Sequence, residues 1–185
     1  MSSKIDYWFF ENYLTKNEII MLNKFIENNF DREQPKKHIP KGVTSTSKVL
    51  QIEYYKIKDK LNLLVQAAYN TGLKEFGYNL TPINDLEYFN LNIYSSKNKG
   101  EYQSHYDASN SDMYDIKLTL LINISLKKYK GGELEYLNVD WKKMKHLDKP
   151  GNLVILKSHF HHKVSPIISG ERRTLAHFMS GPKFS

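Results

Sequence analysis

The chain has 185 residues, a formal net charge of +7 at pH 7 and no cysteine. One compact domain, covering residues 1–185, is expected at this length. The absence of cysteine excludes disulfides, thiolate metal sites, iron–sulfur clusters and a cysteine nucleophile, so any metal ion must be held by His, Asp or Glu. No signal-peptide pattern and no apolar run long enough for a membrane span are found, which predicts a soluble, cytoplasmic protein.

The positive charge permits an acidic partner such as a nucleic acid. However, its lysines are spread over separate turns, with clusters at residues 36–37, 127–130 and 142–145. Such spacing is typical of a solvated surface rather than of a binding groove. Charge alone therefore assigns no partner.

The first part of the chain, to about residue 84, is predicted to be helical. Thr15 and Glu18 form a capping-box pattern ahead of apolar residues at helical spacing, which predicts a helix to about Asn29. The same spacing predicts a second helix over Ile57–Phe76. Between the two, Asp31–Ser47 is rich in Pro, Lys, Ser and Thr and is predicted to be a mobile loop.

From Asp85 onward the apolar residues recur with a period of two. Phe89, Leu91 and Ile93 alternate with polar and aromatic neighbours, and a second alternating run covers Ile116–Ser125. Shorter runs separated by Gly and Pro follow at Glu133–Leu137, Asn152–Lys157, Lys163–Ile167 and Arg172–Met179. Many short strands with regular turns indicate a sandwich or barrel.

A His-x-Asp triplet directly follows a predicted strand. In an extended segment the side chains of His105 and Asp107 point to the same face and could share a metal ion. The triplet alone is a weak signal, because a surface turn could hold the same residues. His162, followed ten residues later by Arg172, strengthens it. Two histidines and one carboxylate leave open positions on an octahedral ion, as in non-haem iron(II) oxygenases, and a guanidinium suits a dicarboxylate.

These motifs, in this order, resemble the prolyl-4-hydroxylase-like branch of the 2-oxoglutarate and iron(II)-dependent oxygenases. The resemblance runs from about Asp6 to the end and is carried by GEYQSHYD at 100–107, LTLLIN at 118–123, YKGGEL at 129–134, PGNLVIL at 150–156 and residues 162–182. It implies an α+β fold, with a double-stranded β-helix (jelly-roll) core over about residues 85–185 and N-terminal supporting helices.

The same resemblance implies a catalytic centre. His105, Asp107 and His162 would bind Fe(II), and Arg172 would bind the distal carboxylate of 2-oxoglutarate. The implied reaction hydroxylates an unactivated carbon with O2 and converts 2-oxoglutarate to succinate and CO2; a role for ascorbate is also allowed. The family pattern favours His162 as the ligand over its neighbours His159 and His161.

Further co-substrate contacts are implied at three positions. Thr174 shares a strand face with Arg172, and Tyr94 matches a tyrosine that often lies beside the co-substrate. Members of the family frequently have a second tyrosine where this chain has Asn123, whose amide could still donate a hydrogen bond. Arg173 is the alternative to Arg172, but it lies on the strand face with larger neighbours. The remaining histidines are interpreted as surface or structural: His38, His146 and His177.

The substrate is less well specified, because it is recognised by loops. Tyr102 matches an aromatic residue that lines the substrate pocket of prolyl hydroxylases, whereas Phe178 and Ile116 stand at substrate-side positions where those relatives carry tryptophan and arginine. Tyr102 and Phe178 are predicted to border the substrate. A peptide or protein substrate is favoured, with a free amino acid or other small metabolite as the alternative. A nucleic-acid demethylase is disfavoured because Phe178 replaces a second arginine, and a non-enzymatic barrel because the metal ligands are intact. Oligomeric state is not predicted.

Overall fold

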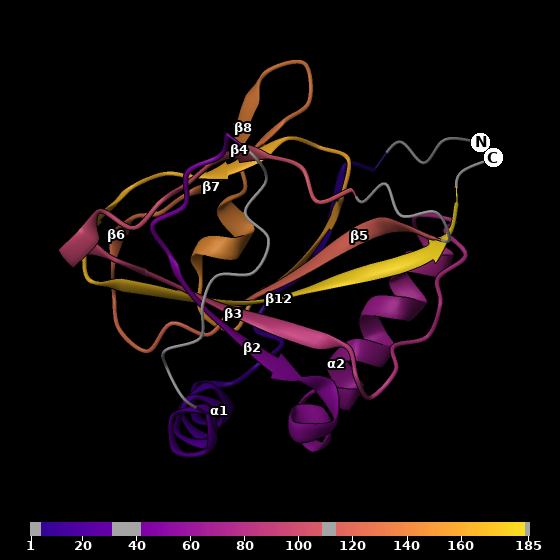
Figure 1. The fold of residues 1–185 in the computed structure, drawn as a ribbon, viewed down its shortest axis with the longest axis horizontal. Coiled ribbons are helices and arrows are strands. Elements are labelled where there is room, and N and C mark those ends of the chain that lie inside the picture. Colours follow the sequence, from indigo (N-terminus) through magenta and orange to yellow (C-terminus); the bar gives the residue numbers. More distant parts are fainter. Residues whose placement is uncertain (1–4, 31–41, 109–113, 184–185) are drawn as a thin grey trace.

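Two antiparallel sheets packed face to face form the centre of the protein in a computed structural model that describes residues 5–30, 42–108 and 114–183 (Figure 1). The larger sheet has the order β1 (Tyr7–Phe10), β9 (Leu153–Lys157), β5 (Tyr114–Asn123), β12 (Glu171–Pro182), β3 (Tyr88–Ser95) and β2 (Lys48–Glu53). The smaller sheet has the order β4 (Tyr102–His105), β10 (His162–Val164), β7 (Leu134–Leu137) and β8 (Trp141–Lys143). A separate pair joins β11 (Ile167–Ser169) to β6 (Lys130–Gly131). This is the predicted α+β jelly roll.

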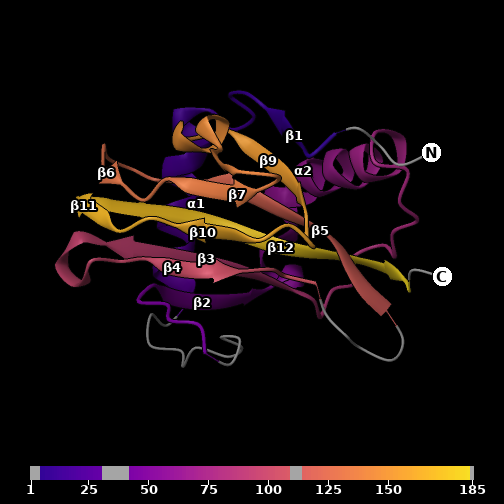
Figure 2. The same cartoon turned by 90° about the horizontal axis from the view of Figure 1, so that it is seen from above.

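Two helices cover the face of the larger sheet that the smaller sheet leaves free (Figures 1 and 2). They are α1 (Lys16–Asn29) and α2 (Tyr54–Lys74), and two short 3-10 helices, η1 (Ser96–Asn98) and η2 (Lys145–Asp148), lie in connections. The predicted capping box is present, since Thr15 Oγ1 accepts from the Glu18 backbone and Glu18 Oε2 accepts from the Thr15 backbone. None of the described helices has the apolar length needed to cross a membrane.

The period-two pattern of β3 separates the core from the space between the sheets. Phe89 and Leu91 are buried against the helices, while Asn90, Asn92 and Tyr94 point to the opposite face and line a cavity. The same division applies to β2, where Leu50 and Ile52 are buried while Val49 and Gln51 line the cavity. One face of the larger sheet therefore holds the apolar core, and the other is available for a site.

The first part of the chain also contains strands that the helical interpretation did not predict. β1 pairs with β9 and β2 pairs with β3, so their hydrogen-bonding partners lie far along the chain or beyond α2. The local spacing of apolar residues does not indicate pairing partners so distant in the sequence. Of the predicted loop at 31–47, residues 31–41 lie outside the described part. Residues 42–47 lie alongside β4, and Ser45 forms a β-bridge with Tyr102.

Candidate active site

Two histidines and an aspartate meet between the sheets. His162, the first residue of β10, lies directly opposite His105, the last residue of β4, and Asp107 follows two residues later. His105 Nε2 lies 3.6 Å from Asp107 Oδ1, and His162 Nε2 lies 3.4 Å from Asp107 Oδ2. One ligand atom from each residue lies within 4.8 Å of the others, the only such group of three found among the described residues.

Backbone carbonyls orient both imidazoles. His105 Nδ1 lies 2.8 Å from the Gln103 carbonyl oxygen and His162 Nδ1 lies 3.1 Å from that of Phe160, so each Nδ1 carries the proton and donates it. Burial and the neighbouring His162 lower the pKa of His105, which keeps that ring neutral at pH 7. The two Nε2 atoms and the carboxylate thus face one another, a donor set that fits a divalent cation.

Asp107 is itself held in place. The Thr119 hydroxyl of β5 donates to Asp107 Oδ2 at 2.6 Å, and the Asp107 backbone N–H donates to the Ser158 carbonyl. Thr119 comes from the larger sheet, whereas the two histidines come from the smaller one. Both sheets therefore contribute to the position of the carboxylate.

Arg172 is a buried cation with unused hydrogen-bonding capacity. Its side chain is 2% exposed, and its Nε has no hydrogen-bond partner. The hydroxyl of Thr174, two residues along the same face of β12, is also buried without a partner. A Cβ built at Gly132, where φ is +70°, would lie 3.3 Å from Arg172 Cδ, so glycine leaves the arginine room. Because buried polar groups are normally satisfied, these atoms fit an anionic ligand.

Arg173 points to the other side of the sheet, as the alternation predicted. Its guanidinium pairs with Glu27 of α1 and with Glu171, and it also donates to Asn23. Arg173 therefore attaches α1 to the larger sheet, and Arg172 faces the cavity.

The other histidines lie away from the Asp107 carboxylate. His161 is exposed beside Ser104, His159 packs against Phe160, and His146 stacks on Phe9. His177 is buried in the opposite direction, stacked on Phe89. His38 lies outside the described residues. Of the three histidines at 159–162, the structure brings only His162 to the predicted metal group.

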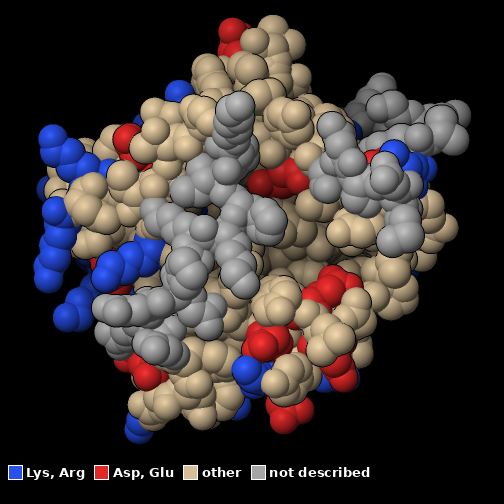
Figure 3. All heavy atoms as spheres, viewed as in Figure 1, with Lys and Arg blue, Asp and Glu red and all other residues tan. Residues whose placement is uncertain are grey.

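One open cavity of about 960 Å³ connects these groups. The three predicted metal ligands and Arg172 line it, together with Tyr94 and Thr174 at the arginine. Tyr102 and Phe178, the predicted substrate-side rings, line it as well. The hollow is visible on the face shown in Figure 3, where acidic side chains gather beside it over the end of β2 and the start of β3.

The model of a known protein family, the 2OG-Fe(II) oxygenase superfamily, matches residues 89–180. That range runs from β3 into β12 and includes all four predicted metal and co-substrate residues. The chain belongs to this superfamily. It is therefore an iron(II)- and 2-oxoglutarate-dependent oxygenase, and the donor set above agrees with that chemistry.

Solved prolyl hydroxylases share the fold of this oxygenase. A prolyl-4-hydroxylase of Pseudomonas putida is 13% identical over 98% of this chain and 95% of its own, with a TM-score of 0.71. A viral collagen prolyl hydroxylase of Paramecium Bursaria Chlorella virus-1, in a 2OG complex, is 18% identical over 98% and 99%, with a TM-score of 0.69.

A third structure contains a peptide. A Trichoplax adhaerens prolyl hydroxylase, in complex with a fragment of the hypoxia inducible factor oxygen degradation domain, is 16% identical over 95% of this chain and 84% of its own, with a TM-score of 0.70. At these identities the likeness concerns the fold. No match was found among curated proteins.

Asn123 of the oxygenase forms hydrogen bonds with Tyr129 and with the segment of η2. Its side chain is fully buried, and Nδ2 lies 2.9 Å from the Tyr129 hydroxyl oxygen and 2.8 Å from the Leu147 carbonyl. Its Oδ1 accepts from the Ser125 backbone. These bonds already use most of the hydrogen-bonding capacity of the Asn123 amide. The contact of Asn123 with the co-substrate stays a prediction.

Tyr129 lies beside Arg172, near which Asn123 was expected to contact the co-substrate. Its hydroxyl lies near the charge of the Arg172 guanidinium and donates to the Asp148 carbonyl at 3.2 Å. The charge of Arg172 also acts on Asp148, whose pKa is raised mainly by burial. Tyr94 contacts the same guanidinium through its ring, with the centroid 5.4 Å from Arg172 Cζ. Sequence reasoning missed Tyr129 because it lies in a connection, where no periodicity indicates direction.

Polar residues on the cavity face of the larger sheet were also not proposed as site residues. Asn90 and Asn92 share the strand face of Tyr94, and the alternation in the sequence could have shown this. Gln51 lies opposite Asn90 in the register of β2 and β3. Its place on the cavity wall depends on a strand pairing that the sequence did not predict.

Proposed function

We propose that this oxygenase hydroxylates an unactivated carbon in a peptide or protein and releases succinate and CO2. The observation that carries the proposal is the presence, in one cavity, of the His–Asp–His group and a buried arginine with an unused donor. Iron(II) supplies O2 activation when bound. The rest of the cavity must bind the two carbon compounds and exclude water from their reacting ends.

The residues divide this work. His105, Asp107 and His162 hold the metal, with their orientation set by the two backbone carbonyls and by Thr119. The guanidinium of Arg172 binds the distal carboxylate of 2-oxoglutarate.

Thr174 assists through its hydroxyl, which has no other partner. Burial raises the pKa of Tyr94 to about 12, so its phenol stays protonated and can donate a hydrogen bond into the cavity.

The shape of the cavity supports a peptidyl substrate. A volume of about 960 Å³ leaves much space after a small dicarboxylate is bound, and the cavity is open to solvent. Tyr106 and Tyr114 line it and are 48% and 43% exposed, so aromatic surface is available at its mouth. Exposed aromatic residues at a groove favour contact with an extended chain. The peptide bound by the Trichoplax protein lends further support.

Succinate release from the iron-loaded protein tests this function. A panel of proline-containing peptides, other peptides and free amino acids should show stimulation by at least one peptide, and mass spectrometry should find one added oxygen in it. A chelator should abolish both signals. Stimulation by free amino acids only would contradict the peptidyl substrate while leaving the reaction class intact.

Tyr102 and Phe178 are expected to border the reacting carbon. Tyr102 stacks on His105 with ring centroids 3.7 Å apart, and Phe178 is half-buried on the cavity face of β12. Replacing either by alanine should uncouple the enzyme: 2-oxoglutarate decay continues, while hydroxylated product falls by about ten-fold or more. Succinate and product are measured on the same variants, with melting temperature as the control for folding. Wild-type coupling in both variants would remove these rings from the substrate site.

Tyr129 is proposed as a positioning residue for Arg172. Tyr129→Phe removes the hydroxyl that lies near the guanidinium and should raise the KM for 2-oxoglutarate by about 3- to 10-fold, the size of effect expected for the loss of one polar contact. The kcat at saturating 2-oxoglutarate should stay near the wild-type value. Tyr136→Phe, at a phenol that contacts Asp6, is the matched control. A fall in kcat without a change in KM would contradict the positioning role.

A further inference from the structure

Two side-chain amides lie next to each other on the wall of the cavity. Gln51 of β2 and Asn90 of β3 are direct partners in the register of these antiparallel strands, and both line the cavity. Directly opposed residues of an antiparallel pair point to the same face, with Cβ atoms about 4.5–5.5 Å apart. The two amides, here called the amide pair, can therefore contact one bound group together.

The protein leaves the amide pair without partners. Asn90 Oδ1 is buried and has no hydrogen-bond partner, and within the described part of the chain no hydrogen bond is found for the side chain of Gln51. Turning a carboxamide over exchanges its donor and its acceptor, so a ligand that matches it in either orientation carries both an N–H and a C=O group. Because buried polar groups are normally satisfied, these side chains fit a ligand with an amide of its own.

The register of the sheet places the amide pair between the co-substrate and the substrate side. The cavity face of β12 runs from the proposed 2-oxoglutarate contacts to the proposed substrate ring in the order Arg172, Thr174, Ala176 and Phe178. Asn90 lies opposite Ala176, one step along this face beyond Thr174. On the other side of β12, Thr119, which holds Asp107, lies opposite Phe178. The amide pair is therefore level with the place where the substrate must meet the metal group.

Only a side chain of a peptide would reach this depth. The exposed rings of Tyr106 and Tyr114 are at the mouth of the cavity, where an extended chain would lie. Asn90 Oδ1, in contrast, is buried. The main-chain amides of the substrate would thus stay near the mouth, and the amide that meets the pair belongs to a side chain.

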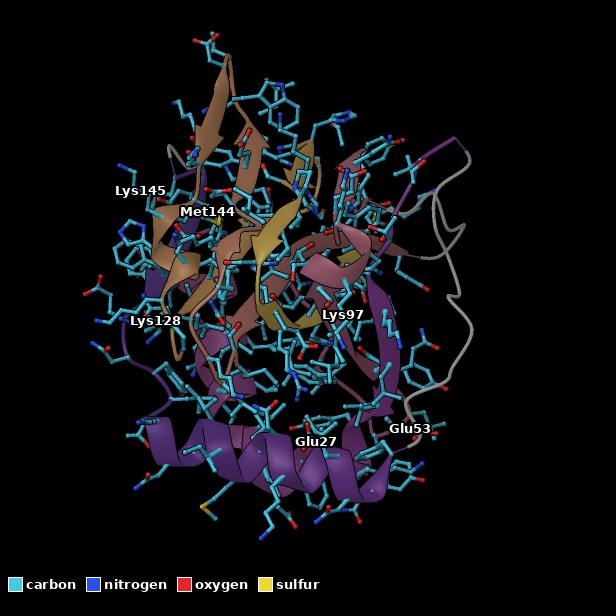
Figure 4. All side chains as sticks on the ribbon, turned by 90° about the vertical axis from the view of Figure 1, so that its left-hand side faces the viewer. Glu27, Glu53, Lys97, Lys128, Met144 and Lys145 are labelled. Atoms are coloured by element: carbon cyan, nitrogen blue, oxygen red, sulfur yellow. The ribbon has the colours of Figure 1, made fainter. Side chains whose placement is uncertain are left out.

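The wall around the amide pair carries no charge. Its neighbours along the two strands and across β12 that line the cavity are Val49, Tyr88, Asn92 and Ala176. Basic side chains gather instead along the left-hand edge in Figure 3, and Figure 4 places Lys97, Lys128 and Lys145 on that edge. A charged group of the substrate would therefore meet no counter-charge on this wall, whereas a neutral amide needs none.

The charged residues that do line the cavity are engaged elsewhere. Although the chain has 27 Lys and Arg residues, Arg172 is the only one among the described residues that line the cavity, and it is assigned to the co-substrate. Asp107 belongs to the metal group. Glu87 Oε2 lies 3.8 Å from His177 Nε2, and His177 stacks on Phe89 on the helix-covered face of the sheet. Neutral hydrogen-bonding groups are thus what the amide pair offers a substrate.

We propose that Gln51 and Asn90 bind the carboxamide of an asparagine or glutamine side chain, beside the carbon that is hydroxylated. The inference rests on the proposed function and narrows its peptide substrate to one with a neutral amide at the reacting residue. Such a group brings the N–H and the C=O that the pair lacks, and it carries no charge into an uncharged wall.

Two sets of blocked tripeptides, acetyl-Gly-X-Gly-amide, test the inference. In the first set X is asparagine, leucine or aspartate, which have nearly the same shape and differ in polarity and charge. In the second set X is glutamine, methionine or glutamate, which match one another in length. Titration calorimetry is performed on the full chain with Mn²⁺ and 2-oxoglutarate, so that no turnover is required. In at least one set the amide peptide is expected to bind about ten-fold or more tightly than its apolar and its acidic match.

Three variants locate the effect. Asn90→Leu keeps the shape of the side chain without its polar atoms and should bring the amide and apolar peptides to within about two-fold of each other, while Gln51→Met should reduce the preference in part. The melting temperature of Asn90→Leu should equal or exceed that of the wild type, because the change removes a buried oxygen without a partner. Asn29→Leu is the control: it makes the same change at an exposed residue of α1, and the preference should remain.

The same titrations with free asparagine, leucine, glutamine and methionine separate the inference from the proposed function. A preference for the amide among the free amino acids alone would contradict a peptidyl substrate and leave the inference standing. If no amide compound bound more tightly than its apolar match, failure of both to bind included, the inference would be overturned. A preference that survived in Asn90→Leu, or that was lost equally in Asn29→Leu, would overturn it as well.

Discussion

Asp107→Ala is expected to abolish both metal binding and 2-oxoglutarate turnover. The carboxylate lies 3.6 Å and 3.4 Å from the Nε2 atoms of His105 and His162, so its removal leaves two ligands where three converge. Loss of a supporting residue around a metal typically costs 10–100-fold, and loss of a ligand should cost about 100-fold or more. Mn²⁺ affinity and succinate release measured on the same preparation should fall together.

Two controls make this result specific. The melting temperature of metal-free Asp107→Ala should stay close to that of the metal-free wild type, because within the described part of the chain the carboxylate makes one side-chain hydrogen bond, to Thr119. His161→Ala changes an exposed neighbour of the ligand His162 and should retain metal affinity and turnover. Full turnover by Asp107→Ala, or an equal loss in His161→Ala, would refute the assignment of the ligands.

Arg172→Lys should weaken 2-oxoglutarate binding by about 1.5–3 kcal/mol, the range for hydrogen bonds to charged groups. This corresponds to a Kd roughly 10- to 150-fold higher. Lysine keeps the charge but lacks the planar pair of donors that matches a carboxylate. It also lacks the guanidinium plane that faces the ring of Tyr94. Titration of 2-oxoglutarate into the Mn²⁺-loaded protein measures the change directly.

Arg173→Lys is the matched control for that titration. Its guanidinium bonds to Glu27, Glu171 and Asn23, on the far side of the sheet from the cavity. The variant should therefore lower the melting temperature by loosening α1, while the affinity for 2-oxoglutarate stays near the wild-type value. If the two arginine variants lost 2-oxoglutarate affinity equally, the assignment of Arg172 would be incorrect.

Local signals in the sequence were sufficient for several elements. The capping box at Thr15 and Glu18 marked the start of α1, and the spacing of apolar residues identified α2, although the helix begins at Tyr54 rather than at Ile57. The alternation after Asp85 identified β3, β5 and β12. These signals are local, because capping, helical periodicity and strand alternation each depend on residues a few positions apart.

The sequence by itself determined the chemistry of this protein. The order His105, Asp107, His162 and Arg172, with its spacing, predicted an iron and 2-oxoglutarate site, and alternation chose Arg172 over Arg173. Only the tertiary structure decided what surrounds that site. Tyr129 reaches Arg172 from a connection, and Glu87 faces His177 across the start of β3.

These contacts join residues 43 and 90 positions apart, and the strands β1 and β2 likewise pair with distant or later segments. A residue's partners across two sheets depend on register, turns and packing, and local sequence patterns do not encode these.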